Sequence, residues 1–141
     1  MNEREIVRKI KEYENKISDL SDEKNHLINV IDELDTSRIS IRARKENMEG
    51  VFCNRVASFE KLSVYRSRGV TKISEKMKEY NSIYSSSSYV WKAIQTIQNL
   101  IDDINRNIEK RMDRVSEIDS YIQRYEEKIR ILKQQKARME G

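Results

Sequence analysis

Apolar residues recur every seven positions through the first third of this 141-residue chain, and no other feature limits the possible fold as strongly. One column of the repeat contains Ile6, Tyr13, Leu20, Leu27, Leu34, Ile41 and Met48. A second column, three residues earlier, contains Ile10, Ile17, Lys24, Ile31, Arg38 and Lys45. Spacings that alternate between three and four residues place both columns on one stripe of an α-helix, which packs against another helix.

A second repeat near the C-terminus supplies the expected partner helix. Its first column contains Ile94, Ile101, Ile108, Val115, Ile122 and Ile129. Its second column contains Ile97, Ile104, Ile118, Tyr125, Leu132 and Met139, with Arg111 as the polar interruption. The basic residues Lys24, Arg38 and Lys45 in the first repeat have two interpretations. They either fix the register and the choice of partner, or they extend their apolar stems along the seam to reach water.

Few residues in this sequence are able to interrupt a helix. Proline is absent, and we expect Gly50 to end the first helix. Beyond it Phe52, Phe59, Ile73 and Tyr80 keep a seven-residue register, with Arg66 as the polar exception, and the register continues to Ile94 through a run of four serines, Ser85 to Ser88. Serine is a mediocre helix former that caps well. The run therefore either belongs to one continuous helix or forms a turn that starts a new one.

The predicted helices are residues 3–48, 52–83 and 88–139, with the last two either separate or continuous. We predict a single all-α domain over residues 1–141. Its architecture is either an elongated antiparallel helical hairpin or a three-helix coiled-coil bundle.

Composition argues against several classes of function. No window of about 18 apolar residues is present, and the N-terminal sequence lacks the apolar segment of a signal peptide. Cys53 and His26 each stand alone, so the sequence gives no metal or cofactor site and no histidine-based catalytic group. We expect a non-enzymatic protein without cofactors that is cytoplasmic, or exported without a cleavable signal peptide.

Positive charge is concentrated in the middle of the chain. Residues 38–78 contain eleven Lys or Arg against four Asp or Glu. If Gly50 marks a turn, many of these residues gather at one tip of a hairpin, where an anionic partner would dock. The members of this predicted basic tip are Arg38, Arg42, Arg44, Lys45, Arg55, Arg66 and Arg68. Nucleic acid is one such partner, although no nucleic-acid-binding motif is present.

Residues 51–59 resemble part of a known family. A helix of about fifty residues is followed by Val51, Cys53, Val56 and Phe59, and then by a longer helical region. This order resembles the small helical accessory proteins that accompany LXG toxins in Gram-positive type VII secretion. In that family a Trp-x-Gly turn follows the first helix, and a phenylalanine lies eight positions beyond the tryptophan. Here Val51 and Cys53 replace the tryptophan and the glycine. A second candidate for the turn is Trp91-Lys92-Ala93.

The resemblance implies a non-enzymatic targeting factor that binds the helical N-terminal region of a secreted toxin for type VII export. The residues expected to contact the partner are the aromatic anchors Phe52, Phe59, Tyr84 and Trp91. A second hypothesis needs no toxin. In it the chain is a self-assembling coiled-coil scaffold, in which another copy of the chain covers the apolar stripes as a homodimer.

Overall fold

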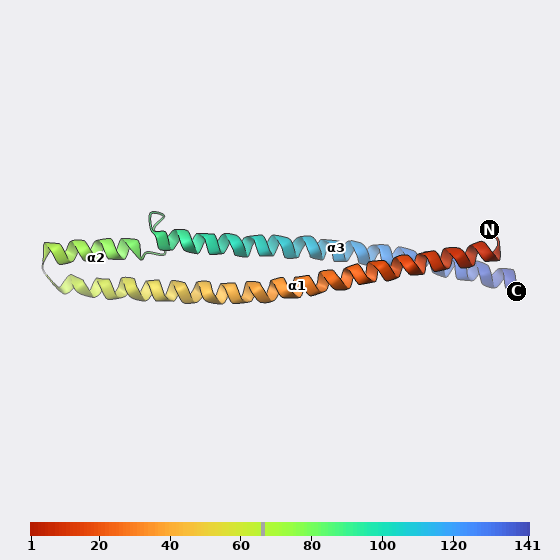
Figure 1. Cartoon of the computed structure of the whole chain (residues 1–141), viewed down its shortest axis with the longest axis horizontal. Helices are drawn as coiled ribbons and strands as arrows, with labels where there is room; N and C mark the ends of the chain where they lie inside the picture. The colour runs from red at the N-terminus through yellow and green to blue at the C-terminus, as the bar shows by residue number, and fades with distance from the viewer. Residues whose placement is uncertain (66) are drawn as a thin grey trace. The chain divides into compact units, whose positions relative to one another are not determined.

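A computed structural model describes residues 1–65 and 67–141 and contains three α-helices within them (Figure 1). Helix α1 spans Glu3–Glu60, α2 spans Arg68–Tyr80 and α3 spans Tyr89–Glu140, with a short 3-10 helix, η1, at Lys61–Val64. The described residues are 91% helical and contain no strand, and α1 packs against α3. The all-α prediction is confirmed.

The chain forms two compact units. Unit 1 contains Met1–Leu34 and Asn107–Gly141, and unit 2 contains Asp35–Arg106.

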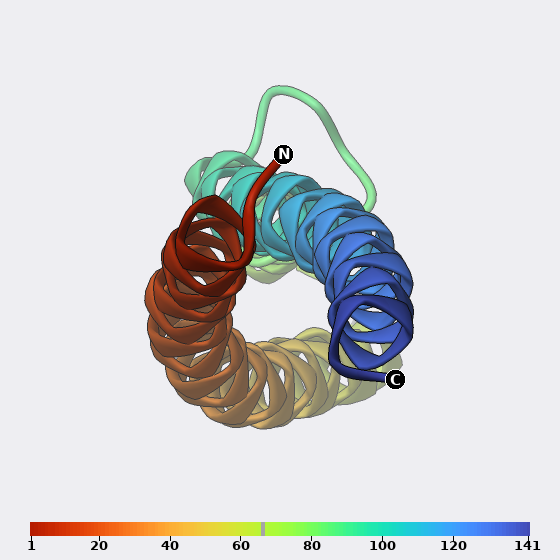
Figure 2. The ribbon, with the colours of Figure 1, turned by 90° about the vertical axis from the view of Figure 1, so that its right-hand side faces the viewer.

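Unit 1 is a pair of antiparallel helical segments whose two termini lie at the same end (Figure 2). The rings of Tyr13 and Tyr125 lie 5.5 Å apart, and Lys24 Nζ donates to Asp119 Oδ1 over 2.6 Å. Later residues of α1 thus meet earlier residues of α3, as an antiparallel pair requires. The buried apolar side chains of this unit are Ile6, Ile108, Ile118, Ile129 and Leu132.

A charged pair on the surface of unit 1 also joins α1 to α3. Arg114 donates through Nε and Nη2 to the two carboxylate oxygens of Glu23, at 2.9 and 3.1 Å. This hydrogen bonding lowers the pKa of Glu23 below its ordinary value and raises the pKa of Arg114. The pair therefore favours the charged form of both groups.

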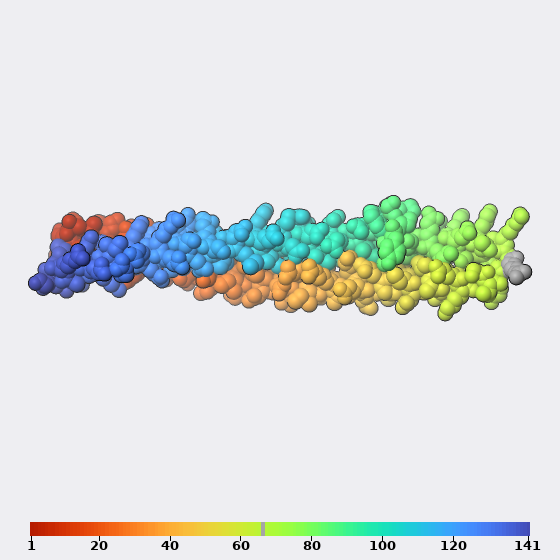
Figure 3. Space-filling model, turned by 180° about the vertical axis from the view of Figure 1, so that it is seen from behind, coloured from red at the N-terminus to blue at the C-terminus, as the bar shows by residue number. Residues whose placement is uncertain are grey.

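Unit 2 contains the end of α1, the whole of α2 and the start of α3. Its buried apolar side chains are Ile94, Ile101 and Ile104, all on α3. The α2 and α1 segments lie side by side (Figures 1 and 3). Buried Ser74 of α2 donates through its hydroxyl to the backbone carbonyl oxygen of Phe59 on α1 over 2.8 Å.

The basic residues in the seam have polar partners on α3. In unit 2, Arg38 Nη1 donates to Asn105 Oδ1 over 2.8 Å, and Lys45 Nζ donates to Gln98 Oε1 over 2.9 Å. The two donors are seven residues apart on α1, and their acceptors are seven apart in the reverse direction on α3. A shift in register would separate these two donor–acceptor pairs.

Gly50 does not end the first helix, which corrects the predicted boundary at residue 48. Helix α1 continues through it to Glu60. No glycine of the described chain has the positive φ that a glycine at a helix end commonly adopts. The predicted helix 52–83 is consequently divided, because residues 52–60 belong to α1 and α2 ends at Tyr80.

The serine run does separate two helices. Residues 81–88 form a loop that stands out from the helices of unit 2 (Figure 2), and α3 begins at Tyr89. Ser88 Oγ accepts hydrogen bonds from the backbone N–H groups of Val90 and Trp91, at 3.2 and 3.4 Å. Its own hydroxyl donates to the carbonyl oxygen of Tyr80 over 2.9 Å. Ser88 is therefore the N-cap of α3, and it also fixes the end of α2.

Candidate functional site

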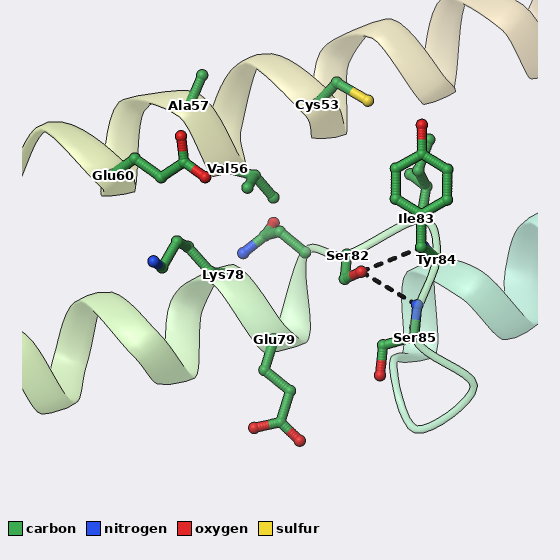
Figure 4. A pocket seen from close by; sticks show the side chains of 11 residues that line it. Cys53, Val56, Ala57, Glu60, Lys78, Glu79, Ser82, Ile83, Tyr84 and Ser85 are labelled. Carbon is green, nitrogen blue, oxygen red and sulfur yellow. Dashed lines mark hydrogen bonds between the residues drawn. The ribbon is translucent and has the colours of Figure 1, made fainter.

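A pocket of about 480 Å³ lies in unit 2, between α1 and the loop that follows α2 (Figure 4). Its apolar wall includes Val56 on α1 and Ile83 and Tyr84 on the loop, and the thiol of Cys53 lies on the same wall. The volume falls within the range of about 300–1,000 Å³ that is typical of ligand pockets. The pocket offers both apolar and polar contacts, because the rest of its lining includes Glu60, Lys78, Glu79, Asn81, Ser82 and Ser85.

The loop conformation places Tyr84 at the edge of this pocket. Ser82 Oγ accepts hydrogen bonds from the backbone N–H groups of Tyr84 and Ser85, each at 3.1 Å (Figure 4). A serine that bonds its own following backbone makes a compact turn without a helix or strand. This turn presents the Tyr84 side chain, which remains 85% exposed.

Helix α2 carries a stripe of exposed apolar side chains. Ile73 is 55% exposed, Met77 38% and Tyr80 52%. At 3.6 residues per turn these three residues fall within an arc of about 60° on the helix. The spacing of four and then three residues is the one that helices use to place anchors in a groove on a partner.

The four predicted anchors differ in their exposure to solvent. Tyr84 is exposed, whereas Phe52, Phe59 and Trp91 are half-buried. The guanidinium of Arg55 lies over the Phe52 ring, 4.8 Å from its centroid. Of the four, Tyr84 is therefore the side chain that is free to meet a partner.

Sequence reasoning missed the stripe on α2. Ile73 and Tyr80 keep a seven-residue register in the sequence, and their spacing with Met77 was the available signal. Whether these three side chains face the core or the solvent depends on which side of α2 meets α1. Buried Ser74 marks that side.

The predicted basic tip does not form around Gly50, because that residue lies inside α1. Arg38 and Lys45 bond to side chains of α3. The members that are exposed are Arg42, Arg44, Arg55 and Arg68, whereas Arg66 lies outside the described residues. At 1.5 Å per residue, the α1 members extend over about 25 Å of helix. They do not gather at a turn.

Other kinds of site are not indicated. Within residues 1–65 and 67–141 no three His, Cys, Asp or Glu side chains are placed to hold a metal ion. No helix in that part of the chain combines the length and the apolar character needed to cross a lipid bilayer.

The comparisons with known proteins do not supply an assignment. No protein family, curated protein or solved structure matches the chain. Val51 and Cys53, which occupy the turn positions of the LXG accessory proteins in the resemblance, lie inside α1. Trp91-Lys92-Ala93 is also helical, because it lies inside α3, which begins at Tyr89.

Proposed function

We propose that this protein is a non-enzymatic helical adaptor, and that it binds a helix of another protein through unit 2. The observation that carries the proposal is the exposed stripe of Ile73, Met77 and Tyr80 on α2. Contiguous exposed apolar side chains that are bordered by polar ones commonly mark binding surfaces. Tyrosine suits such a surface, since its ring is buried on binding while its hydroxyl keeps a polar contact.

The resemblance described above gives this proposal a particular form. In that form the partner is the helical N-terminal region of a secreted toxin, and the adaptor accompanies it to type VII export. The all-α fold and the long first helix agree with such a role. The Trp-x-Gly turn of the family does not support it, because the corresponding residues are helical.

A second candidate function is self-assembly, and a feature of unit 1 favours it. Apart from buried Ile6, the apolar α1 side chains of the repeat in this unit are only half-buried: Ile10, Tyr13, Ile17, Leu20, Leu27, Ile31 and Leu34. One helix does not cover a wide apolar face completely. A second copy of the chain would bury what remains exposed.

The two functions are distinguished by what the full-length chain binds. We would tag the chain in its source cells, cross-link, purify it and identify the bound chains by mass spectrometry, with light scattering to give their stoichiometry. A stoichiometric second polypeptide that is cross-linked to α2 or the following loop supports the adaptor. Recovery of the tagged chain alone, as a dimer, supports the scaffold and contradicts the adaptor.

Two tyrosines provide a matched pair of variants. Tyr84→Ala removes an exposed ring at the pocket, whereas Tyr89→Ala removes a ring of similar exposure on the first residue of α3. We expect Tyr84→Ala to weaken complex formation and Tyr89→Ala to leave it unchanged. Equal complex formation by both variants and the wild type would show that the pocket edge is not part of the interface.

A further inference from the structure

Basic side chains border the apolar stripe of α2. Arg68, Lys72 and Lys76 are all exposed and are spaced by four residues, so they form one row along the helix. The neighbouring row contains Ile73 and Met77, also spaced by four. The surface thus has an apolar stripe with a positively charged edge.

Two carboxylates lie beside this row, because Glu75 and Glu79 follow Lys72 and Lys76 by three residues on α2. Like charges four residues apart on a helix repel each other. Among the residues that the structure describes, no carboxylate forms an ion pair with Arg68, Lys72 or Lys76. An anionic partner along the same edge would form the ion pairs that these basic groups do not make within the described residues.

We propose that the occupant of this surface is an acidic amphipathic helix from another protein, which deepens the adaptor function and rests on it. The apolar face of that helix covers Ile73, Met77 and Tyr80. Its Asp or Glu side chains, on one edge, lie against Lys72 and Lys76. The charges set the orientation of the bound helix, and the apolar contacts supply most of its affinity.

A second copy of this chain is a poorer occupant. If two α2 helices pair antiparallel about a twofold axis, each edge meets the same edge of the other helix. Lys72 and Lys76 would then face the same lysines across the interface, where like charges are unfavourable.

An anionic membrane is also a poorer occupant. Helices that lie on membranes present a broad apolar face with large hydrophobic residues. The stripe on α2 is narrow, because its three apolar residues fall within an arc of about 60°.

The test uses the full-length chain and a pair of synthetic probes. Both are amphipathic helical peptides of about 20 residues with the same apolar face. One has Glu along its edge positions and the other has Lys. Binding of the fluorescently labelled peptides is measured by anisotropy at about 0.1 M and about 1 M salt. We expect the Glu peptide to bind about tenfold more tightly than the Lys peptide at low salt, and the difference to shrink at high salt.

Charge-reversal variants locate the effect on α2. Lys72→Glu with Lys76→Glu should abolish or invert the preference between the peptides. The control variant, Arg42→Glu with Arg44→Glu, makes the same change in net charge at exposed positions of α1 and should retain the preference. Ile73→Ala with Met77→Ala should lower affinity for the Glu peptide about tenfold at both salt concentrations, because it removes the apolar contacts.

Three results would overturn the proposal. The first is equal binding of the two peptides by the wild type, or no binding of either. The second is an equal effect of the α1 and α2 charge reversals on the preference between the peptides. That result would indicate that the net charge of the whole protein attracts the Glu peptide, and that the basic row of α2 has no specific role. The third is binding to phosphatidylglycerol vesicles that depends on Lys72 and Lys76 without binding to either peptide. A helical partner captured in cells would then still support the adaptor function, whereas failure to capture one would contradict that function whatever the peptides do.

Discussion

Replacing Gly50 by alanine should stabilise the protein. The residue lies inside α1, is exposed, and does not have positive φ. A Cβ atom built at this position has no heavy atom within 4 Å outside the neighbouring helix backbone. Alanine therefore keeps the backbone conformation and meets no obstacle.

The size of the effect follows from helix propensity. Glycine in the interior of a helix is about 0.8–1.0 kcal/mol less favourable than alanine, largely because the unfolded chain has more freedom at glycine. With no steric term to subtract, we expect Gly50→Ala to raise the free energy of unfolding by about 0.5–1 kcal/mol. The opposite sign is expected if Gly50 ends a helix in the left-handed conformation, where a Cβ costs about 1–2 kcal/mol.

Urea unfolding followed by circular dichroism at the helix band would measure the difference. Gly69→Ala is the control, because it changes the second residue of α2, where propensity contributes less, and its Cβ makes an ordinary 3.8 Å contact with Ser67 Oγ. A loss of stability in Gly50→Ala would refute the continuous helix through this residue. An unchanged midpoint would show that the backbone here is already frayed.

Three further perturbations test other parts of the structure. Ile118→Ala removes a side chain with no exposed surface and should lower the free energy of unfolding by about 2–5 kcal/mol in the same urea assay. Ile131 on the same helix is 42% exposed, so Ile131→Ala should lower it by about 1 kcal/mol, and equal losses would contradict the packing. Ser88→Ala should cost about 1–2 kcal/mol, with exposed Ser86→Ala near zero, and tryptophan fluorescence would report the change at the start of α3. The hydrogen bonds from Arg114 lower the pKa of Glu23, so this pair stabilises the fold above the ordinary glutamate pKa, and its contribution is lost as the pH falls through the lowered value. The unfolding free energy of Glu23→Gln should therefore decline less than that of the wild type between about pH 6 and about pH 3. An identical decline in both proteins would exclude the linkage.

Much of the fold was predictable because its strongest signals are periodic. The repeat that includes Ile101 and Ile118 predicted a long helix with one buried stripe, and both residues are among the most buried in the protein. The continuation of α1 through Gly50 was not predictable from the residue type. A single glycine costs about 1 kcal/mol in a helix, which the pairing of the surrounding stripe with another helix outweighs.

The candidate site was less accessible to sequence reasoning. Tyr84 was selected as an aromatic anchor and is exposed, whereas Phe59 was selected on the same grounds and is half-buried. The stripe of Ile73, Met77 and Tyr80 has the same spacing as a stripe that faces a core. Sequence spacing specifies that residues share a face of a helix, but it does not specify what that face meets.

The sequence by itself determined that the chain is helical and that its two long helices have apolar stripes, because a helix of 3.6 residues per turn converts a seven-residue repeat into one face. Only the tertiary structure decided where α1 ends, that Lys45 donates a hydrogen bond to Gln98, and which side of α2 faces solvent. These outcomes depend on contacts between residues far apart in the chain. Their energies are set by burial and by the partners of polar groups, neither of which a local pattern contains.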